Sequence, residues 1–506
     1  MTKQDGKGEK MDRKPNVIYI LADDMGYGDV SAFNENAGFQ TPNLDEMREE
    51  GIAFTDAHAS SAVCTPSRYS ILTGRYNWRS RLKCGVMSGY SSPLIEEGRM
   101  TAGHLFQENG YVTAAIGKWH LGMEFKKDDT FVENEEYEVC PGVDYAGKIE
   151  KSPITNGFNY FYGISASLDM PPYIYIENDR FTHMPDHETE NTGKQFWRKG
   201  PAAPDFVHED VLPHLTEKVL DKIEEYKDRP FFIYFPMPAP HTPILPSAEF
   251  LGKSGTNEYG DFVLMCDAVA GKISDKLKEL GLYENTIVIY ASDNGCAPMA
   301  DFKELLAAGH NPSYVFRGHK ADIYEGGHRV PLIVRWPDLI PGGQRCDKLV
   351  CLSDFFATMA DYLGAEIPED AAVDSVSNLP LWKDADTPSV REDVIHQSMN
   401  GSLSIRKGKY KLEMCPGSGG WSYPAPGEET DEMPQFQLYN LETDIGEKHN
   451  VIAEHPAVAE YLKGILLNDI RRGRSTPGPD QKNDGAEIWD AVKWMESEQA
   501  GVANKV

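Results

Sequence analysis

The sequence is poor in basic residues. Its 506 residues include 50 Lys and Arg against 79 Asp and Glu, which gives a formal net charge of -29. A surface with this charge repels phosphate backbones, so nucleic acid is not an expected partner. It also repels polyanionic sugars at long range, and an anionic substrate would therefore need a local basic pocket.

Long apolar runs are also missing. No run approaches the roughly 20 apolar residues that span a membrane, and the longest, around Phe231 to Phe235, has the length of a buried strand. The N-terminal stretch MTKQDGKGEKMDRKPN is polar and lacks the apolar core of a signal peptide. We expect no membrane partner and a cytoplasmic location by default, or a periplasmic or secreted one if a leader has been removed.

The eight cysteines show neither a CxxC pair nor zinc-type spacing. A few disulfides are compatible with the sequence, but a chain of this size needs no disulfide framework. We interpret seven of the eight as ordinary thiols, whereas the neighbours of Cys64 suggest chemistry. The cysteines are Cys64, Cys84, Cys140, Cys266, Cys296, Cys346, Cys351 and Cys415.

Strand-like and helix-like segments alternate along most of the chain. Nearly continuous apolar segments are typical of strands in a sheet that is covered on both faces, and they occur at 16–22, 112–116, 231–235, 286–291 and 331–335. Helical patterns occur between them at 44–50, 101–109, 215–226 and 258–280. The alternation predicts an α/β fold with a large, mostly parallel sheet flanked by helices.

The composition divides the chain into three parts: a disordered tail at 1–14, a catalytic domain at 15–383 and a smaller C-terminal subdomain at 384–506. Within the catalytic domain, residues 124–210 are rich in Pro, Gly and Tyr, and we interpret them as loops that wall a substrate pocket. The C-terminal part is predicted to be α+β with an antiparallel sheet, from strand-like runs at 403–407, 410–414 and 437–440 and a helix-like stretch at 457–471.

Two acidic pairs follow two of the predicted buried strands. Asp23-Asp24 follow residues 16–22, and Asp293-Asn294 follow the strand at 286–291. Ligands of such sheets collect at the carboxyl ends of the strands. An isolated pair of this kind is more often a turn or a helix cap, but two pairs at two strand ends favour a metal site. Their hard oxygen atoms suit Ca²⁺ and are poor ligands for zinc.

Cys64 stands where a helix is predicted to begin. Pro66, followed by a helical apolar pattern, indicates a helix N-terminus, where amide groups and the helix dipole favour negative charge. Arg68 lies one turn further on and can face the same site. From these residues alone, a structural cysteine and a functional one are equally good interpretations.

The segment Cys64-Thr65-Pro66-Ser67-Arg68, followed by Leu72-Thr73-Gly74-Arg75, resembles the signature of the sulfatase family. Further family motifs occur in the expected order, and with Asp23-Asp24 they make six elements between residue 16 and about residue 335. They are GKWHLG at 117–122, PHTP at 240–243, SDNG at 292–295 and RGHK at 317–320 with EGG at 325–327. His319 departs from the pattern, because glycine is common there, and we expect it to reach the substrate.

The resemblance implies that a maturation enzyme oxidises Cys64 to formylglycine (3-oxoalanine). It also implies one Ca²⁺ per chain, with ligands from Asp23, Asp24, Asp293, Asn294 and the modified Cys64. The hydrated aldehyde would supply two hydroxyl groups, of which one attacks sulfur and the other later expels sulfate. A serine or a thiol cannot take that second step.

The resemblance further implies the roles of the remaining motif residues. Arg68, Lys118 and Lys320 would bind sulfate oxygens and spread the charge of the transition state. Asp293 would take a proton from the hydrate, and His241, with Lys320, would protonate the leaving oxygen. His120 would accept the proton of the second hydroxyl group.

The substrate predicted from the sequence is a sulfated carbohydrate that is cleaved from chain ends. Aromatic side chains suit a sugar ring, and they occur in residues 124–210 and in the C-terminal part. In the C-terminal part, CPGSGGW at 415–421 resembles the corresponding region of many bacterial sulfatases. We expect the leaving group to contact Asp169, Arg317, His319 and His396. Two alternatives remain: a phosphonate or phosphodiester hydrolase of the alkaline-phosphatase-like superfamily, and a catalytically silent protein that binds sulfated glycans.

Overall fold

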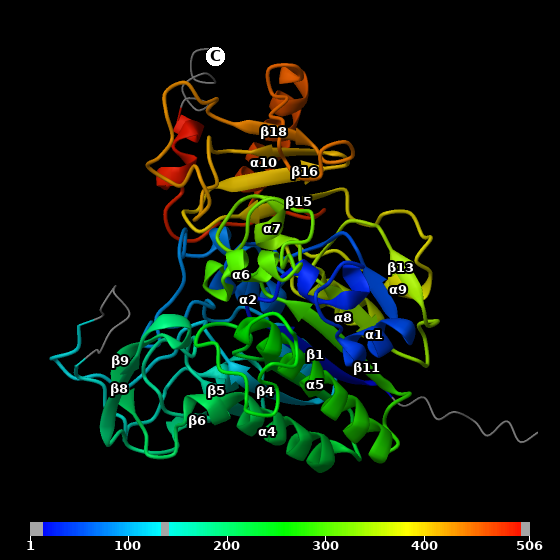
Figure 1. Cartoon of the computed structure of the whole chain (residues 1–506). Helices are drawn as coiled ribbons and strands as arrows, with labels where there is room; N and C mark the ends of the chain where they lie inside the picture. The colour runs from blue at the N-terminus through cyan, green and yellow to red at the C-terminus, as the bar shows by residue number, and fades with distance from the viewer. Residues whose placement is uncertain (1–13, 133–140, 497–506) are drawn as a thin grey trace, which may run out of the picture.

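The computed structural model describes residues 14–132 and 141–496 (Figure 1). Its centre is a sheet of ten strands, in which β1 (Asn16–Ala22) lies between β10 (Phe231–Pro236) and β11 (Thr286–Ser292). Every residue of these three strands is buried, as expected for strands that helices cover on both faces. The predicted α/β fold is confirmed.

The strand directions place several carboxyl ends at one edge of the sheet. β1 pairs in parallel with both β10 and β11, β10 pairs in parallel with β4 (Val112–Lys118), and β4 pairs in parallel with β5 (Tyr160–Ile164). The order continues beyond β11 with β12 (Leu332–Arg335), β2 (Ile52–Phe54) and β13 (Gln344–Cys346), and beyond β5 with β6 (Ile176–Glu177) and β7 (Arg180–Phe181). The β11–β12 pair is antiparallel, which makes the sheet mixed rather than fully parallel.

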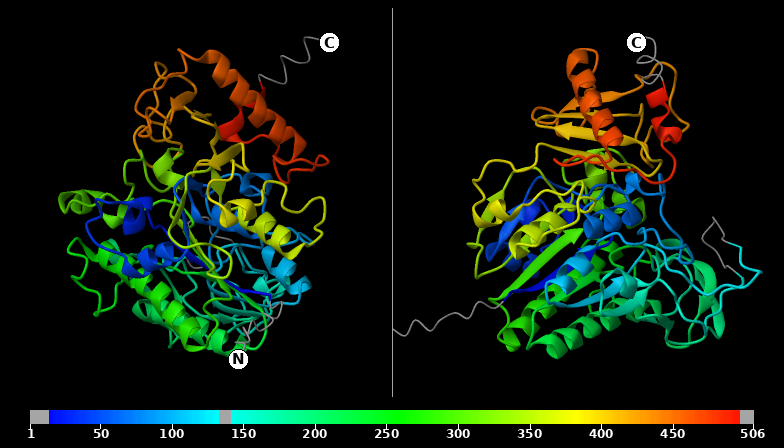
Figure 2. Two further views of the ribbon diagram at one scale, coloured as in Figure 1. Left: turned by 90° about the vertical axis from the view of Figure 1, so that its right-hand side faces the viewer. Right: turned by 180° about the vertical axis from the view of Figure 1, so that it is seen from behind.

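Helices cover both faces of this sheet (Figures 1 and 2). On one face α5 packs beside two further helices, and on the other α2 packs beside two more. The first group is α1 (Pro42–Glu49), α4 (Val211–Tyr226) and α5 (Glu258–Glu279); the second is α2 (Cys64–Thr73), α3 (Ala102–Glu108) and α8 (Asp354–Leu363). The shorter elements are β3 (Ala57–His58), α6 (Phe302–Ala307), α7 (Glu325–His328), β14 (Val350–Cys351) and α9 (Leu379–Lys383).

The predicted antiparallel sheet of the C-terminal part is also confirmed. Four consecutive strands pair in order, and helix α10 (Pro456–Arg472) packs across them. Val394, Ile405, Leu412 and Leu466 belong to a hydrophobic cluster separate from that of the large sheet. The strands are β15 (Asp393–Gln397), β16 (Leu403–Lys407), β17 (Tyr410–Glu413) and β18 (Gln437–Asn440). The domain boundary at residue 383 stays a prediction.

The interpretation of residues 124–210 as loops was incomplete. This stretch contributes β5, β6 and β7 to the large sheet, and it forms a separate antiparallel ribbon of β8 (His187–Asn191) and β9 (Trp197–Ala202). A Cβ atom at Gly163 of β5 would lie 1.9 Å from the carbonyl oxygen of Gly117. The close approach of two strands therefore requires a glycine there, and that glycine weakened the strand pattern in the sequence.

The predicted tail at 1–14 lies outside the described residues except for Lys14, as does Cys140. The seven cysteines in the described ranges are all free thiols. Among the described helices, none is both long enough and apolar enough to cross a membrane.

Candidate active site

The two acidic pairs meet at the carboxyl edge of the sheet. Ala22 and Ser292 are register partners in the β1–β11 pair, so Asp23 and Asp293 leave adjacent strands at the same level. The Asp24 amide donates to Asp293 Oδ1 at 3.2 Å, and Asn294 Nδ2 donates to Asp24 Oδ1 at 2.7 Å. All four predicted metal ligands of these pairs are at most 1% exposed.

This acidic cluster fits a hard divalent cation. Asp23 Oδ1 and Asn294 Oδ1 are buried and have no hydrogen-bond partner among the described residues, which is costly unless another group satisfies them. Burial, opposed by Arg68 and reinforced by the neighbouring Asp23 carboxylate, raises the pKa of Asp293 to about 7. An ion with all-oxygen coordination such as Ca²⁺ would satisfy these two oxygens, which accept no hydrogen bond, and offset the crowding of carboxylates.

Backbone strain accompanies this cluster. Asp24 has a φ of 64° and His120 a φ of 59°, in the left-handed region that non-glycine residues rarely occupy. Such strain collects at functional sites, where the surrounding structure holds it. Gly117 has a φ of 132°, and a Cβ there would lie 2.0 Å from the carbonyl oxygen of Pro236. Only glycine can stand at this position, directly before Lys118.

Cys64 is the first residue of α2 and is 3% exposed. Burial raises the pKa of its thiol, whereas Lys118 and Lys320 lower it. The net direction is upward, so the unmodified thiol is a poor nucleophile at neutral pH. Val63 precedes the helix and gives it no side-chain cap. The first amide groups of α2, where Cys64 lies, are therefore not satisfied by a capping side chain.

Arg68 connects the helix to two strands of the sheet. Its Nε and Nη2 donate to Asp293 Oδ2 at 2.9 and 2.7 Å, and its Nη1 donates to the carbonyl of Lys118 at 3.0 Å. The guanidinium is completely buried and also lies 3.4 Å from Asp23 Oδ1. This bidentate arrangement fixes the side chain as a rigid part of the site.

Two lysines approach the same carboxylates. Lys118 Nζ donates to Asp23 Oδ2 at 2.7 Å, and Lys320 Nζ donates to Asp24 Oδ2 at 2.7 Å. With Arg68 they give three cationic groups against three carboxylates, counting Asp293 as ionised. A divalent cation would therefore leave the site with an excess positive charge, which suits an anionic substrate in a protein of strongly negative net charge.

His120 is set up to accept a proton. Its Nε2 lies 2.7 Å from the carbonyl oxygen of Met87, so Nε2 carries the hydrogen and donates it. Burial, together with Lys118 and Arg68, holds the pKa of His120 well below its usual value, so the ring is neutral. Its Nδ1 is buried and has no hydrogen-bond partner among the described residues, which leaves that lone pair available.

His241 lies beside the acidic cluster. Its Nε2 is 3.5 Å from Asp24 Oδ2, and its ring nitrogens are 3.3 and 3.4 Å from Ser167 Oγ. The side chain is 7% exposed, so it stands nearer to solvent than His120 does. Asp23, Asp24 and His241 also place ligand atoms within 4.8 Å of one another, but the carboxylate and amide oxygens already provide a calcium-type set without the imidazole.

Asp169 lies next to His241 and pairs with Arg198, a residue that the motifs did not reveal. Arg198 of β9 pairs through Nη1 with Asp169 Oδ2, and His241 and Arg198 both lower the pKa of Asp169. Asp169 Oδ1 is buried and has no hydrogen-bond partner among the described residues. Arg198 belongs to no sequence motif, and its position in the 124–210 insertion was the only available signal.

Arg317, His319 and His396 are placed differently from one another. Arg317 Nη1 donates to the carbonyl of Glu447 at 2.8 Å, and the guanidinium lies over Tyr324. It therefore turns towards the C-terminal part rather than towards Cys64. His319 adjoins Lys320, and its Nε2 lies 3.2 Å from Ser422 Oγ.

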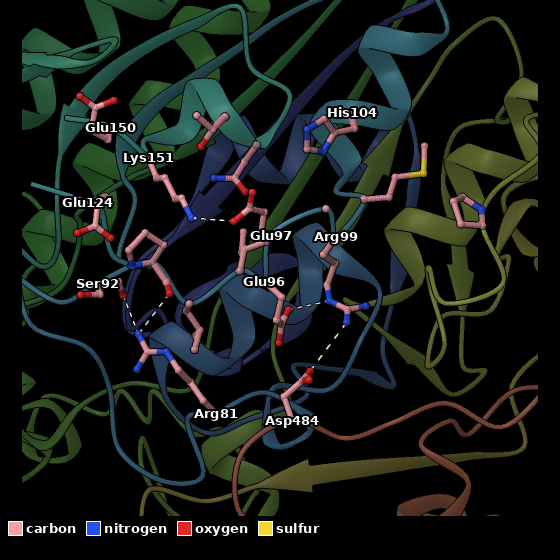
Figure 3. A pocket seen from close by; sticks show the side chains of 18 of the residues that line it. Arg81, Ser92, Glu96, Glu97, Arg99, His104, Glu124, Glu150, Lys151 and Asp484 are labelled. Atoms are coloured by element: carbon pink, nitrogen blue, oxygen red, sulfur yellow. Dashed lines mark hydrogen bonds and ion pairs between the residues drawn. The ribbon is translucent and has the colours of Figure 1, made fainter. Parts of the chain in front are cut away.

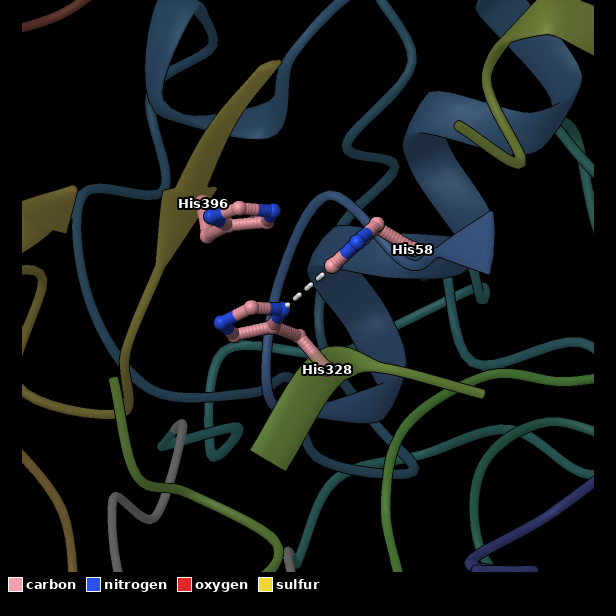
Figure 4. A group of neighbouring side chains, drawn as sticks. All are labelled: His58, His328 and His396. Carbon is pink, nitrogen blue, oxygen red and sulfur yellow. Dashed lines mark hydrogen bonds between the residues drawn. The ribbon is translucent and has the colours of Figure 1, made fainter. Parts of the chain in front are cut away.

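His396 lies in a buried group with His58 and His328 (Figure 4). One nitrogen of each ring lies within 4.8 Å of the others, but the rings of His328 and His396 stack with centroids 3.6 Å apart and planes 12° apart. A metal ion binds in the plane of each imidazole, and one ion cannot lie in two stacked planes. We therefore regard the group as structural, and the structure does not bring His396 together with Cys64.

Acidification should destabilise the protein through this histidine group. Burial lowers the pKa of His58, His328 and His396 below the usual value near 6.5. Because these pKa values are depressed in the folded state, the unfolded chain takes up protons first as the pH falls. The free energy of unfolding is therefore fully present above the unfolded pKa near 6.5. Below that pH it falls by up to about 1.4 kcal/mol per pH unit for each histidine. Urea unfolding between pH 8 and pH 5 should show a shallower loss in His396→Gln than in the wild type. Equal slopes would contradict this role.

Comparison with known proteins identifies the family. The sequence model of the sulfatase family matches residues 15–365. An N-acetylgalactosamine-6-O-sulfatase from Bacteroides thetaiotaomicron is 34% identical over 499 residues, covering 90% of this chain and 93% of that protein. N-acetylgalactosamine-6-sulfatase from Mus musculus is 28% identical, covering 86% of this chain and 78% of that protein.

Solved structures agree with this. A sulfatase structure concerned with the metabolism of multiple glycosaminoglycans by Bacteroides thetaiotaomicron has a TM-score of 0.78 and 32% identity, and it covers 90% of this chain and 99% of that one. The phosphonate monoester hydrolase of Agrobacterium radiobacter, with a TM-score of 0.57 and 19% identity, covers 90% of this chain and 95% of that one and shares the fold alone. The chain belongs to the sulfatase family. It is accordingly a sulfuric ester hydrolase.

Proposed function

We propose that this sulfatase removes a sulfate group from the end of a sulfated glycan, with oxidised Cys64 as nucleophile and one Ca²⁺ as cofactor. The observation that carries the proposal is the position of Cys64. Its thiol is buried and lies within the field of both lysines and of Asp23 and Asp293. Placed there, an aldehyde hydrate would lie between a metal and an anion site, where a developing charge is stabilised.

Asp23, Asp24, Asp293 and Asn294 would hold the ion together with modified Cys64. Bound Ca²⁺ would supply a Lewis acid that favours the ionised form of a neighbouring hydroxyl group. Arg68 keeps the Asp293 carboxylate oriented through two hydrogen bonds to one oxygen. A lysine has three donors. Lys118 donates to Asp23 and to Ser167 Oγ, which leaves one N–H group for a sulfate oxygen, and Lys320 donates to Asp24, which leaves it further N–H groups.

The two histidines would carry protons in opposite directions. The neutral His120 has a free lone pair on Nδ1 and would accept a proton when sulfate is expelled. His241 is more exposed than His120 and lies beside Ser167 and Asp169. There it would protonate the oxygen of the leaving sugar, with Lys320 assisting. Asp293 would act as the first proton acceptor.

Removal of calcium should inactivate the enzyme and lower its stability. Without a divalent cation, the crowding of Asp23, Asp24 and Asp293 in a dehydrated site is offset by Arg68, Lys118 and Lys320 alone. After EGTA treatment and desalting, we expect loss of activity and a fall in the melting temperature, and one equivalent of Ca²⁺ should restore both. The Asp24→Asn variant should show the same lower melting temperature with or without EGTA. If the wild type keeps its metal-free activity, calcium is not the cofactor.

The sugar would be recognised beside His241 by the pair Asp169 and Arg198. The unpaired Asp169 Oδ1 can accept a hydrogen bond from a hydroxyl group, and the side chain of Arg198 is 25% exposed. An N-acetylgalactosamine 6-sulfate unit is the first substrate to test, since relatives from Bacteroides thetaiotaomicron and from mouse bear that name. His319 would border the same space, whereas Arg317 and His396 would support the fold.

Replacing Arg198 should separate sugar recognition from sulfate chemistry. In Arg198→Gln the Asp169 carboxylate loses its cationic partner, and kcat/KM for N-acetylgalactosamine 6-sulfate should fall by about 10–100-fold, as for a partly buried charge-assisted hydrogen bond. Hydrolysis of 4-nitrophenyl sulfate, which has no sugar hydroxyl groups, should change by less than about threefold. An equal loss on both substrates would exclude a role specific to the sugar.

The two alternatives have direct tests. Side-by-side rates on 4-nitrophenyl sulfate and on phenyl phosphonate esters separate the sulfatase from a phosphonate hydrolase. Intact-mass spectrometry of protein coexpressed with a formylglycine-generating maturation enzyme should show a loss of about 18 Da at Cys64. Unmodified Cys64 with retained glycan binding would support the catalytically silent alternative.

A further inference from the structure

A cavity of about 450 Å³ lies between the loop that contains Trp78 and Lys83 and the segment that follows α10. None of the proposed catalytic or metal-binding residues lines it. Three cationic side chains, Lys83, Arg471 and Lys482, face one carboxylate, Glu487, in its lining. The cavity is therefore locally positive in a chain whose formal net charge is -29.

The cations of this cavity are available to a ligand. Arg471 and Lys482 are exposed, and within the described part of the chain neither pairs with a carboxylate. Lys83 Nζ donates to the carbonyl oxygens of Trp78 and Asp484, each at 2.7 Å. Two carbonyl acceptors leave the third N–H of the ammonium group without a partner.

The indole of Trp489 supplies a second, independent sign of a ligand. Trp78 also lines the cavity, but it is 1% exposed and its ring lies against the guanidinium of Arg79, 4.1 Å from the ring centroid, so it forms part of the wall. Trp489 is fixed by a 2.9 Å hydrogen bond from Nε1 to the carbonyl of Gly401, and Lys83 Nζ lies 5.2 Å from its ring centroid. A rigid aromatic face beside cations suits a sugar ring that carries an anionic group.

The larger cavity of about 820 Å³ in Figure 3 lacks these features. Six acidic side chains line it, and its basic residues are engaged. Lys151 pairs with Glu97, Arg99 pairs with Glu96, and Arg81 donates to the carbonyl of Ser92. An anion would meet net negative charge there, so of these two cavities the smaller one has the chemistry of an anion site.

We propose that the cavity formed by Trp78, Lys83, Arg471, Lys482 and Trp489 is a second glycan-binding site that holds a sulfated or carboxylated sugar residue. The inference rests on the proposed function for the identity of the glycan. The site would capture polyanionic chains that the rest of the surface repels. Apolar side chains such as Ile488 and Met495 make it suited to a sugar-borne anion rather than to inorganic sulfate alone.

Lys83 should make binding in this cavity depend on pH. Burial, assisted by the neighbouring Arg75, lowers the pKa of Lys83 to about 8, against the opposing pull of Asp484. A bound anion favours the protonated amine, so affinity should be greatest below that pKa and decline as the pH rises above it. The other charged groups near the cavity are Arg79, Glu96, Arg471, Lys482 and Glu487.

Calorimetric titration of the Cys64→Ala protein with a chondroitin 6-sulfate hexasaccharide would test the site without turnover. Arg471→Gln/Lys482→Gln should weaken binding about tenfold at low salt, as expected for two lost ion pairs. Lys409→Gln/Lys448→Gln removes the same charge elsewhere in the C-terminal part and should leave binding unchanged. Equal losses in both double variants, or none in the first, would overturn the proposal. So would inorganic sulfate that binds as tightly as the hexasaccharide.

Kinetics on the otherwise unmodified enzyme separate this inference from the proposed function. Arg471→Gln/Lys482→Gln should lower kcat/KM for the hexasaccharide by about fivefold to tenfold and leave that for the sulfated monosaccharide unchanged. If the double variant lowers kcat/KM by the same factor on both substrates, relative to the unmodified enzyme, the second site is overturned and the sulfatase assignment stays intact. If neither substrate is hydrolysed, the proposed substrate is wrong, and the calorimetric result still decides whether the second site exists.

Discussion

Replacing Cys64 with alanine should lower kcat/KM for a sulfate ester by at least about 10⁴-fold, because the nucleophile itself is removed. The fold should persist, since the change removes one sulfur atom from the start of α2 and leaves the contacts of Arg68 with Asp293 in place. Initial rates on 4-nitrophenyl sulfate would measure the loss, and circular dichroism would check the fold.

Two further variants make this test specific. Cys64→Ser should also lose turnover, because a serine ester cannot release sulfate by re-forming an aldehyde, and it should retain labelled sulfate after denaturation. Cys84→Ala removes an exposed thiol and should keep full activity. Hydrolysis at the wild-type rate by Cys64→Ala would refute the mechanism, and sustained turnover by Cys64→Ser would show that the aldehyde is not required.

Replacing Lys411 with methionine should destabilise the protein by about 3–5 kcal/mol, the cost of removing one partner from a buried ionic cluster. Lys411 Nζ lies 2.7 Å from Glu447 Oε1 and 3.3 Å from oxygens of both Glu325 and Glu413, and all four side chains are completely buried. Methionine fills the volume but removes the cation beside Glu413 and Glu447, whereas Glu325 keeps its ion pair with Arg329 at 3.2 Å. The free energy of unfolding in urea would measure the loss.

The contribution of charge can be isolated in the same cluster. Combining Lys411→Met with Glu447→Gln removes one charge of each sign and should recover part of the loss, as a double-mutant cycle would show. Lys409→Met, at an exposed position two residues earlier, should change the free energy of unfolding by less than about 0.5 kcal/mol. A loss of under 1 kcal/mol in Lys411→Met would mean that the carboxylates are protonated in the folded protein.

This cluster connects the chain segments on both sides of the site. Glu325 follows Lys320 closely in sequence, and Lys411 lies in β17 of the C-terminal sheet. Lys411 Nζ also lies 3.1 Å from His328 Nε2, and His328 Nδ1 lies 3.1 Å from His58 Nδ1. His58 stands six residues before Cys64, so the C-terminal sheet buttresses the segment that leads to the proposed nucleophile.

The sequence by itself determined the local features of this protein. Apolar runs ending in Asp23-Asp24 and Asp293-Asn294 predicted two strand ends, and Pro66 predicted the start of α2 close to Cys64; the structure shows each of these elements. Such signals are readable because strand burial, helix capping and metal-ligand chemistry depend on residues close together in the chain.

Only the tertiary structure decided which distant residues meet. It paired Asp169 with Arg198, turned Arg317 towards Glu447, stacked His396 on His328 and assembled the cationic cavity around Lys83. The partners in these contacts come from segments that no periodicity connects, and their approach depends on how strands and helices pack. The sequence could supply the chemistry of Cys64 and its motifs, whereas the arrangement of the groups that would choose the sugar required the fold.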